Sequence, residues 1–358
     1  MQQAHCATLG QQRVSFVKRI TAHGRNPRQR DIGQHDAYAS AMSSAAPERV
    51  HEYRNHHLDS TRWDHFRVRD GDIVVTTAYK AGTTWTQRIL AALVLGLEPD
   101  GRSLSEISPW IDARFMGPVE PMIESLDAQT HRRFVKSHLA ADGVRYFPEA
   151  KYVVVGRDTR DVFMSLWNHY SAYTDIAYSL FNDGERPGAE FPRCPEQPAD
   201  LWPRWIGAGW FEWEPDGWPF WSHSHHLSTW WQWRDLPNVY FVHFADLLAD
   251  TEGEMRRLAI YCEIDVAEER WPAIVAAVQL DAMRADAKRG GASDAVAMIF
   301  DGGLDRFLFK GTNGRWRGVL SDDDLLRYEQ ASATLHPGLR AWLERGRAAT
   351  DLHGPTPT

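Results

Sequence analysis

The sequence predicts an α/β protein, a single domain with a central parallel β-sheet flanked by helices. Two observations lead to this fold class. Short runs of β-branched and apolar residues recur along the chain, and segments with the composition of helices follow most of them. Strands that alternate with helices in this way form parallel sheets. With 358 residues, 43% of them hydrophobic, the chain is long enough for one large domain or two ordinary ones.

The elements follow in order along the chain. The first strand, "DIVVTTAY", precedes a helix in which Thr83 or Thr84 lies near the N-cap. Strands are predicted at 72–79, 132–139, 151–157 and 238–244. Helices are predicted at 83–97, 159–173 and 251–264, the last with an acidic first turn. Ligands of parallel sheets bind at the carboxyl ends of the strands, so we expect the functional residues there.

The domain is expected to span residues 46–350. Residues 1–45 are basic, poor in large apolar residues and without clear periodicity, which predicts a disordered extension or an over-called start with initiation near Met42. This stretch has no apolar segment typical of a signal peptide. The tail at 351–358 is expected to be frayed. The acidic run at 322–324 is expected to begin the last helix.

An aromatic-rich insert is expected at about residues 180–235. Nine of the 16 tryptophans fall between Trp202 and Trp233. This composition is too aromatic for disorder, so it predicts a lid or subdomain packed on the core, the wall of an acceptor pocket, or both. His223, His225 and His226 are interpreted as polar tips around this lid, or as acceptor contacts. A metal site is disfavoured because no matching carboxylate motif accompanies them.

The composition argues against several classes of protein. A net charge of −8 disfavours a general nucleic-acid binder, which needs a basic surface. The cysteines, Cys6, Cys194 and Cys262, are far apart, which disfavours a disulfide framework and fits a reducing cytoplasm. The longest apolar run, "ILAALVLGL", is shorter than the roughly 20 residues of a membrane-spanning helix. We therefore expect a cytoplasmic protein without a membrane span.

A candidate anion site follows the first strand. In "TTAYKAGTTW" (76–85) a strand, a loop of small residues and a helix N-terminus follow one another. This arrangement presents backbone N–H groups and the positive end of the helix dipole to a phosphate. The GxxxxGK[ST] pattern of ATP-binding loops is absent, and Lys80 precedes Gly82, which disfavours ATP or GTP chemistry. Taken alone, the stretch also fits a strand-to-helix turn with a surface lysine.

Three further stretches place basic residues at strand ends or in a loop. They are "FVKSHL" at 134–139, "VVVGRDTRDVFMSLW" at 153–167 and "FLFKGTNGRW" at 307–316. In this order the four stretches resemble the motifs of the PAPS-dependent sulfotransferase family, and its soluble small-molecule branch most closely. The resemblance extends from about residue 50 to about residue 345.

The resemblance implies a fold related to that of P-loop nucleotide kinases and a donor, 3′-phosphoadenosine-5′-phosphosulfate (PAPS), without a metal. The family motif YPKSGTTW reads "AYKAGTTW" here, with alanine in place of serine. By resemblance, the loop holds the 5′-phosphosulfate and Trp85 stacks on adenine, although core packing is the alternative for Trp85. The residues assigned to this part of the site are Lys80, Ala81, Gly82, Thr83, Thr84 and Trp85.

The donor's 3′-phosphate is assigned by the same resemblance to Arg157 and Ser165. Arginine suits a phosphate because its planar guanidinium binds two oxygens at once. An ion pair between Arg157 and Asp158 or Asp161 is the alternative.

The family sequence RKGxxGDW appears here as "FKGTNGRW", and by resemblance the donor site includes Phe307, Lys310 and Gly311. Phe309 stands where the family has an arginine, so one phosphate contact is missing. Arg315 or Arg317 is a candidate to replace it. A family tyrosine that approaches adenine corresponds to His243, which puts that contact in doubt.

Three basic residues are predicted to carry the chemistry. A histidine titrates near neutral pH and can accept the proton of an attacking hydroxyl, and His138 also matches the family's catalytic histidine. A lone histidine at a strand end is otherwise usually structural. Lys80 is placed to stabilise the charge that develops on the oxygen between sulfur and phosphorus. Lys136 either assists from the neighbouring strand or is a solvated charge.

The predicted function is sulfuryl transfer from PAPS to a hydroxyl or amine of a small, apolar or aromatic acceptor, by in-line displacement with a histidine base. The alternatives are a carbohydrate sulfotransferase, a kinase-like nucleotide-dependent transferase and a non-enzymatic nucleotide-binding protein. Retention of both Lys80 and His138 argues against the last of these, because binding alone needs no base. A homodimer is a further expectation.

Overall fold

The structure is a computed structural model that describes residues 46–97, 102–289, 292–350 and 352. The described residues from Ala46 onward form one compact unit. The predictions for residues 1–45, including a start near Met42, lie outside the described residues. The tail at 351–358, which was expected to be frayed, also lies outside them except for residue 352.

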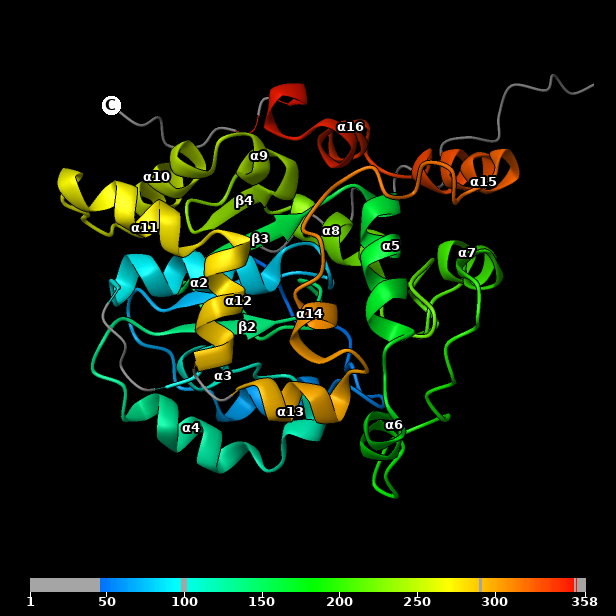
Figure 1. The fold of residues 1–358 in the computed structure, drawn as a ribbon, viewed down its shortest axis with the longest axis horizontal. Helices are drawn as coiled ribbons and strands as arrows, with labels where there is room; N and C mark the ends of the chain where they lie inside the picture. The colour runs from blue at the N-terminus through cyan, green and yellow to red at the C-terminus, as the bar shows by residue number, and fades with distance from the viewer. Residues whose placement is uncertain (1–45, 98–101, 290–291, 351, 353–358) are drawn as a thin grey trace, which may run out of the picture. The chain divides into compact units, whose positions relative to one another are not determined.

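A four-stranded parallel sheet lies at the centre of the unit, in the order β2-β1-β3-β4 (Figure 1). The strands are β1 (Ile73–Thr76), β2 (Phe134–Ser137), β3 (Lys151–Gly156) and β4 (Val239–His243). Each lies inside a predicted strand, and all pairs are parallel, so the predicted fold class is confirmed. Thr76 is in register with Ser137 on β2 and with Val154 on β3, so the strands end at one edge.

Helices connect the strands and cover the sheet (Figure 1). The first group is α2 (Thr83–Val94), α3 (Leu104–Ile107), α4 (Val119–Asp127), α5 (Thr159–Tyr170), α6 (Asp175–Phe181), α7 (Pro198–Gly207) and α8 (His223–Trp231). The second is α9 (Phe244–Ala249), α10 (Thr251–Cys262), α11 (Trp271–Ala277), α12 (Leu280–Arg289), α13 (Ala292–Ile299), α14 (Gly303–Phe307), α15 (Asp322–Ser332) and α16 (Pro337–Arg345). Short 3-10 turns occur at Ser60–His65, Arg114–Met116, Glu268–Arg270 and Arg347–Ala349. Among these described helices, none combines the length and the apolar character needed to cross a bilayer.

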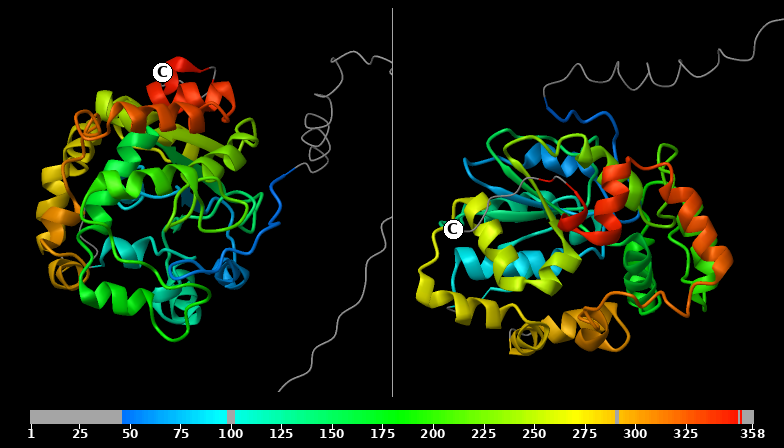
Figure 2. Two further views of the ribbon diagram at one scale, coloured as in Figure 1. Left: turned by 90° about the vertical axis from the view of Figure 1, so that its right-hand side faces the viewer. Right: turned by 90° about the horizontal axis from the view of Figure 1, so that it is seen from above.

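Alternating strand residues build two hydrophobic cores, because successive side chains of a strand point to opposite faces. On β1 and β3, Val75 and Val153 join a core formed with α2, α10 and α11. Val74 and Val154 join the other core, which includes buried residues of α5, α7, α8, α15 and α16. The sheet is therefore the middle of three layers (Figure 2). Burial of both faces explains why its strands read as continuous apolar runs.

The tryptophans of the 202–233 segment contribute mainly to the second core. Trp202, Trp205, Trp230 and Trp231 are buried in α7 and α8, against the sheet and the C-terminal helices. Trp342 of α16 packs so closely over Gly156 that an added Cβ there would lie 2.3 Å from its ring. Glycine at the end of β3 is thus required by this close approach.

One local prediction is confirmed and another needs correction. Thr83 is the first residue of α2 and lies directly after the N-cap, Gly82, as expected for a threonine near the N-cap. Gly82 has a φ of 123°, a conformation that glycine adopts more easily than other residues. The acidic run at 322–324 does begin a helix, α15, with Ser321 and Asp324 forming a capping box. It is not the last helix, since α16 follows.

Candidate active site

The carboxyl ends of the strands bring the predicted site residues to one edge of the sheet. The loop from Thr77 to Gly82 follows β1, His138 follows β2 and Arg157 follows β3. Phe244, the first residue after β4, contacts both of the neighbouring loops: its ring lies 4.1 Å from the guanidinium of Arg157 and faces Gly82. The placement expected for a parallel sheet is therefore observed.

His138 is buried and held in one orientation. Its Nδ1 lies 2.7 Å from the carbonyl oxygen of Thr77 and 3.1 Å from the Thr77 hydroxyl. A carbonyl oxygen only accepts hydrogen bonds, so Nδ1 carries the proton and the lone pair lies on Nε2. Burial and the nearby Lys136 hold the pKa of His138 well below its usual value. The residue is thus a neutral imidazole whose Nε2 has no hydrogen-bond partner among the described residues.

A buried carboxylate beneath His138 was missed by the sequence analysis. Asp112 accepts the backbone N–H of His138 at 3.0 Å, and the indole N–H groups of Trp110 and Trp63 at 2.7 and 3.1 Å. Burial raises the pKa of Asp112, while these donors act in the opposite direction. The carboxylate fixes the turn that carries the histidine and the indole of Trp110, which meets the His138 ring edge-to-face at 4.7 Å.

Lys80 lies in the loop between β1 and α2 with a positive φ of 48°, an uncommon conformation for a residue with a side chain. Its Nζ lies 3.2 Å from Nδ1 of His169 and 5.6 Å from the centroid of Phe307. Loss of hydration lowers the pKa of Lys80 to about 7, and the positive charges of Lys136 and Arg157 act in the same direction. Such a cluster of cations favours an anionic ligand.

Lys136 is half-buried on β2 and is not a freely solvated strand-end charge. Its Nζ lies 4.5 Å from the ring centroid of Trp110. Burial lowers its pKa to about 8, although the nearby Asp112 has the opposite effect. Lys136 therefore adds charge to the same edge of the sheet.

The N-terminus of α2 has the form expected of an anion site. Gly82 provides no side-chain cap, and the hydroxyl of Thr83 is bonded to that of Thr77 at 2.7 Å. The first backbone N–H groups of a helix have no partner within the helix, so those of α2 face the loop. Ala81 is buried, Thr84 is half-buried, and Trp85 packs partly against the core and meets Phe244 edge-to-face.

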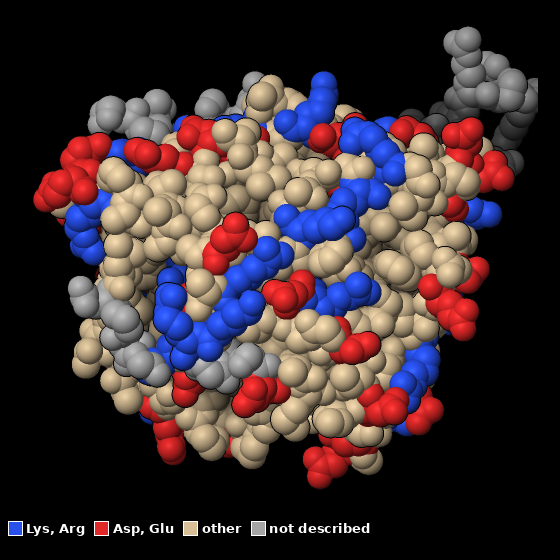
Figure 3. All heavy atoms as spheres, in the orientation of Figure 1, with Lys and Arg blue, Asp and Glu red and all other residues tan. Residues whose placement is uncertain are grey.

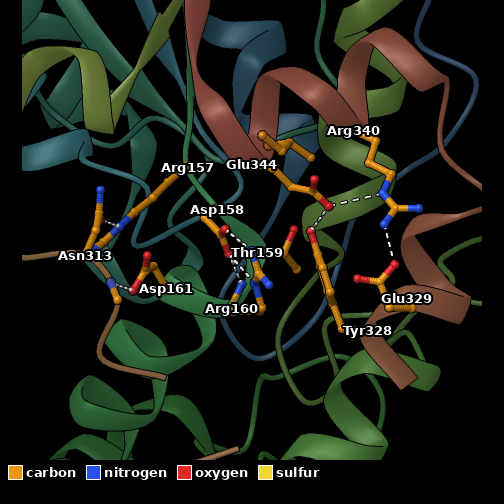
Figure 4. A network of polar contacts seen from close by, with 12 residues as sticks. Arg157, Asp158, Thr159, Arg160, Asp161, Asn313, Tyr328, Glu329, Arg340 and Glu344 are labelled. Atoms are coloured by element: carbon orange, nitrogen blue, oxygen red, sulfur yellow. Dashed lines mark hydrogen bonds and ion pairs between the residues drawn. The ribbon is translucent and has the colours of Figure 1, made fainter. Parts of the chain in front are cut away.

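Arg157 binds the C-terminal loop and forms no ion pair with another described residue. Its guanidinium donates to Asn313 Oδ1 at 2.9 Å (Figure 4). It also donates to the Thr312 carbonyl at 2.8 Å. Asp161 accepts the backbone N–H groups of Gly314 and Arg315 at 2.7 and 3.3 Å. The loop is thus fastened to both ends of the β3–α5 junction.

The neighbouring acids have other partners. Asp158 is bonded to Arg160 at 2.6 Å, and Arg160 lies over the ring of Tyr328, which donates to Glu344 (Figure 4). The arginine that was expected to contact phosphate is consequently left with neutral acceptors, and burial lowers its pKa to about 10.

The remaining predicted donor residues differ in their surroundings. Ser165 is half-buried on α5, and its hydroxyl forms no hydrogen bond within the described chain. Lys310 and Gly311 are exposed, while Phe307 is half-buried beside Lys80. Arg315, one of two suggested replacements for the missing arginine, lies with its guanidinium 4.7 Å from the ring centroid of Phe309. The other, Arg317, lies over Trp316.

His243 has both ring nitrogens engaged inside the protein. Nδ1 accepts the backbone N–H of Ala245 at 3.2 Å and so caps α9, and Nε2 donates to the Leu343 carbonyl at 3.1 Å. The ring is buried against Trp342. These contacts give His243 a structural role at the end of β4.

Aromatic rings surround the space next to His138 and Lys80. Trp221 lies 5.4 Å from the His138 ring and donates to the Ala78 carbonyl, and Tyr173 lies 5.2 Å from His169. His57, which the sequence analysis missed, stacks on Phe181 at 3.9 Å. The segments around His57, Tyr173 and Trp221 are far apart in the sequence, so no local pattern marks these residues as neighbours. They give the site an apolar wall.

The histidines of the aromatic segment are dispersed. His223 lies near Thr159, His225 is 2.7 Å from Asp142, and the ring of His226 contacts Thr76. Over the part of the chain that the structure describes, there is no group of three or more potential metal ligands.

The face of the molecule that carries α12 and α14 bears a diagonal band of lysine and arginine side chains (Figure 3). Basic residues of this part of the sequence include Arg284, Lys288, Arg289, Arg306, Lys310, Arg315 and Arg317. A local basic surface of this kind is compatible with the net charge of −8 and with an anionic ligand.

Comparison with known proteins agrees with this geometry. The sequence profile of the sulfotransferase domain matches residues 70–335. This chain belongs to the sulfotransferase family. A Mycobacterium bovis protein described as a glycolipid sulfotransferase is 32% identical over 319 residues, which cover 84% of this chain and 95% of that protein. Human sulfotransferase 2B1 is 26% identical over 257 residues, covering 70% and 62%. The enzyme class predicted from the sequence is thereby confirmed.

Solved structures share the sulfotransferase fold. Retinol dehydratase in complex with retinol and PAP (3′-phosphoadenosine-5′-phosphate) superposes with a TM-score of 0.57 at 21% identity, covering 82% of this chain and 86% of that chain. Mouse sulfotransferase SULT7A1 complexed with PAP gives a TM-score of 0.55 at 16% identity, covering 76% and 86%.

Proposed function

We propose that this sulfotransferase moves the sulfuryl group of PAPS to a hydroxyl or amine of a small, apolar or aromatic acceptor, with His138 as general base. The observation that carries the proposal is the hydrogen bond from His138 Nδ1 to the Thr77 carbonyl, because it leaves the Nε2 lone pair free to accept a proton. Lys80 and Arg157 gather at the same edge of the sheet.

The residues present suit the donor. Lys80, the N-terminus of α2 and Lys136 supply positive charge for the 5′-phosphosulfate, and Arg157 supplies it for the 3′-phosphate. Ser165, Lys310 and Gly311 complete the second site in this proposal. Because Asn313 and a carbonyl oxygen hold the Arg157 guanidinium, a phosphate oxygen has only neutral acceptors to displace.

The chemical step follows from these positions. His138 Nε2 takes the proton of the acceptor hydroxyl as the oxygen–sulfur bond forms. On the opposite side of the sulfur, the bond to the bridging oxygen breaks and PAP leaves with the electron pair. Lys80 stabilises the negative charge that grows on this oxygen, and Lys136 strengthens the local field.

The aromatic wall supports an apolar acceptor, since Trp110, Trp221 and Tyr173 surround the two histidines His138 and His169. A glycolipid is the second candidate acceptor, favoured by the 32% identity to the mycobacterial glycolipid sulfotransferase. Turnover of phenols and sterols but not of glycolipids would support the first candidate, and the reverse result would support the second.

Calorimetric binding of PAP, compared with AMP and ATP, tests the donor site. Binding of PAP that is much tighter than that of AMP is expected, because only PAP carries the 3′-phosphate. If PAP binds no better than AMP, the proposed donor is wrong.

Two further proposals concern location and assembly. We propose a cytoplasmic location, which the free thiols of Cys194 and Cys262 favour and which cell fractionation tests. We also propose a homodimer, which sedimentation tests.

Replacing Arg157 with alanine is expected to weaken PAP binding by roughly 1.5–3 kcal/mol, which is the contribution of a hydrogen bond to a charged group. Affinity for AMP is expected to change much less, because AMP lacks the 3′-phosphate. Arg145→Ala, at an exposed position, serves as the control. Equal losses for PAP and AMP would show that Arg157 acts on the fold of the site and not on the 3′-phosphate.

PAP affinity is expected to fall as the pH rises above about 7, the pKa of Lys80 in the free protein. The ammonium form binds phosphate, so binding above this pH requires proton uptake and the dissociation constant rises by up to about tenfold per pH unit. Calorimetry between about pH 6.5 and about pH 8.5 measures this slope. Lys80→Arg is expected to flatten it, since arginine stays charged. A slope unchanged in that variant would assign the titration to another group.

A further inference from the structure

We propose that His169 is a positioning residue for Lys80: its Nδ1 accepts a hydrogen bond from the lysine Nζ and aims the remaining N–H groups at the donor's bridging oxygen. The inference rests on the role proposed above for Lys80 and adds a residue to it. His169 lies in the last turn of α5, 89 residues from Lys80 in the sequence, and the two nitrogens are 3.2 Å apart.

The contact with His169 matters because the charges around Lys80 are positive. Lys136 and Arg157 are the charged neighbours of Lys80, and no carboxylate within the described chain forms an ion pair with it. His138 is also close, but the described residues show no hydrogen bond between it and Lys80, and its Nε2 is the atom proposed to take the acceptor's proton. Among the described residues, His169 supplies the side-chain acceptor for Lys80. Without it, the flexible lysine side chain would be repelled by its neighbours and free to adopt other rotamers.

The imidazole is itself held firmly. The ring of Phe300 lies 4.4 Å from that of His169, Tyr173 lies 5.2 Å away and Phe307 lies 6.0 Å away. Phe307 also faces the Nζ of Lys80 at 5.6 Å, so one aromatic ring contacts both partners. This packing fixes the direction of the Nδ1 lone pair.

The geometry also determines the protonation of the pair. An ammonium can only donate, so when Lys80 is charged Nδ1 of His169 accepts, and the imidazole is neutral with its proton on Nε2. An ammonium has three N–H groups. One is used by His169, and the others remain for phosphate oxygens. His169 therefore orients the lysine without competing for the donor.

Two variants separate the hydrogen bond from the packing. His169→Phe keeps an aromatic ring among Phe300, Tyr173 and Phe307 but removes the acceptor nitrogen. His169→Asn loses the ring but provides an amide oxygen near the position of Nδ1. If the hydrogen bond positions Lys80, PAP is expected to bind about 3- to 10-fold more weakly to His169→Phe and within about 2-fold of wild type to His169→Asn. Wild-type affinity in His169→Phe, or weaker binding in His169→Asn than in His169→Phe, would overturn the proposal.

A second measurement decides the contact without any ligand. In full-length protein labelled with ¹⁵N at histidine, His169 is expected to show the Nε2–H tautomer, with an Nδ1 signal that moves toward that of a free imidazole nitrogen in Lys80→Met. An Nδ1–H tautomer, or a signal that ignores this substitution, would refute the pairing even if His169→Phe failed to fold. If wild-type protein does not bind PAP, the proposed function fails. The spectrum still shows whether Lys80 and His169 are hydrogen-bonded, because it needs no ligand.

Discussion

Replacing His138 with asparagine is expected to lower turnover by about 10²–10⁴-fold, the usual contribution of a general base. The amide N–H of asparagine can replace Nδ1–H as donor to the Thr77 carbonyl, so the local structure is retained. Asparagine has no basic nitrogen, however, and cannot take the acceptor's proton. Initial rates with PAPS and any acceptor found by screening measure the effect.

PAP affinity should remain near that of the wild type in the same variant, because His138 acts on the acceptor side. His65→Asn, at an exposed histidine paired with Glu120, is the matched control for the substitution. Undiminished turnover in His138→Asn would remove His138 as the base. A parallel loss of PAP binding would instead show that the residue maintains the donor loop through Thr77.

Replacing Lys80 with methionine is expected to lower turnover by about 10²–10³-fold, comparable to the loss of one donor that stabilises a developing oxyanion. Methionine keeps most of the length of the side chain and its contact with Phe307, but supplies no charge. The leaving oxygen of PAP would then develop its charge without a nearby ammonium. The rate at saturating PAPS isolates this effect from weaker binding.

Lys151→Met provides the comparison. Lys151 begins β3 at the opposite edge of the sheet and pairs with Glu263 on the surface, so its loss should leave turnover unchanged. If both lysine variants lost activity equally, general destabilisation would explain the result. If Lys80→Met retained full activity, the lysine would have no part in the chemical step.

The sheet and the position of the loop between β1 and α2 could be predicted because their signals are local. Each strand is a short apolar run, and Lys80, Gly82 and Thr83 follow one another within a single stretch. The predicted strand and helix ranges therefore differ from the structure by only a few residues at their ends. The close approach of Phe244 to Gly82 could not be predicted, because Phe244 is remote in the sequence; a Cβ added to Gly82 would lie 2.9 Å from its ring.

Asp112, His169 and His57 could not be found in the same way. Asp112 precedes His138 by 26 residues and His169 follows Lys80 by 89, and only the packing of α5 and the β2 turn brings each pair together. A buried carboxylate or a histidine in a helix has no distinctive neighbours in the sequence. The alternative reading of Arg157 as an ion pair failed for the same reason, since Asn313 lies 156 residues away.

The fastening of the C-terminal loop to Arg157 has a consequence for how the protein is made. The sheet is complete when β4 has been synthesised, at His243, but Asn313 and Gly314 emerge from the ribosome some 70 residues later. Domains fold as units. The contacts of Arg157 with its loop can therefore form only after Asn313 has left the ribosome, so closure of this site is a late event in biosynthesis.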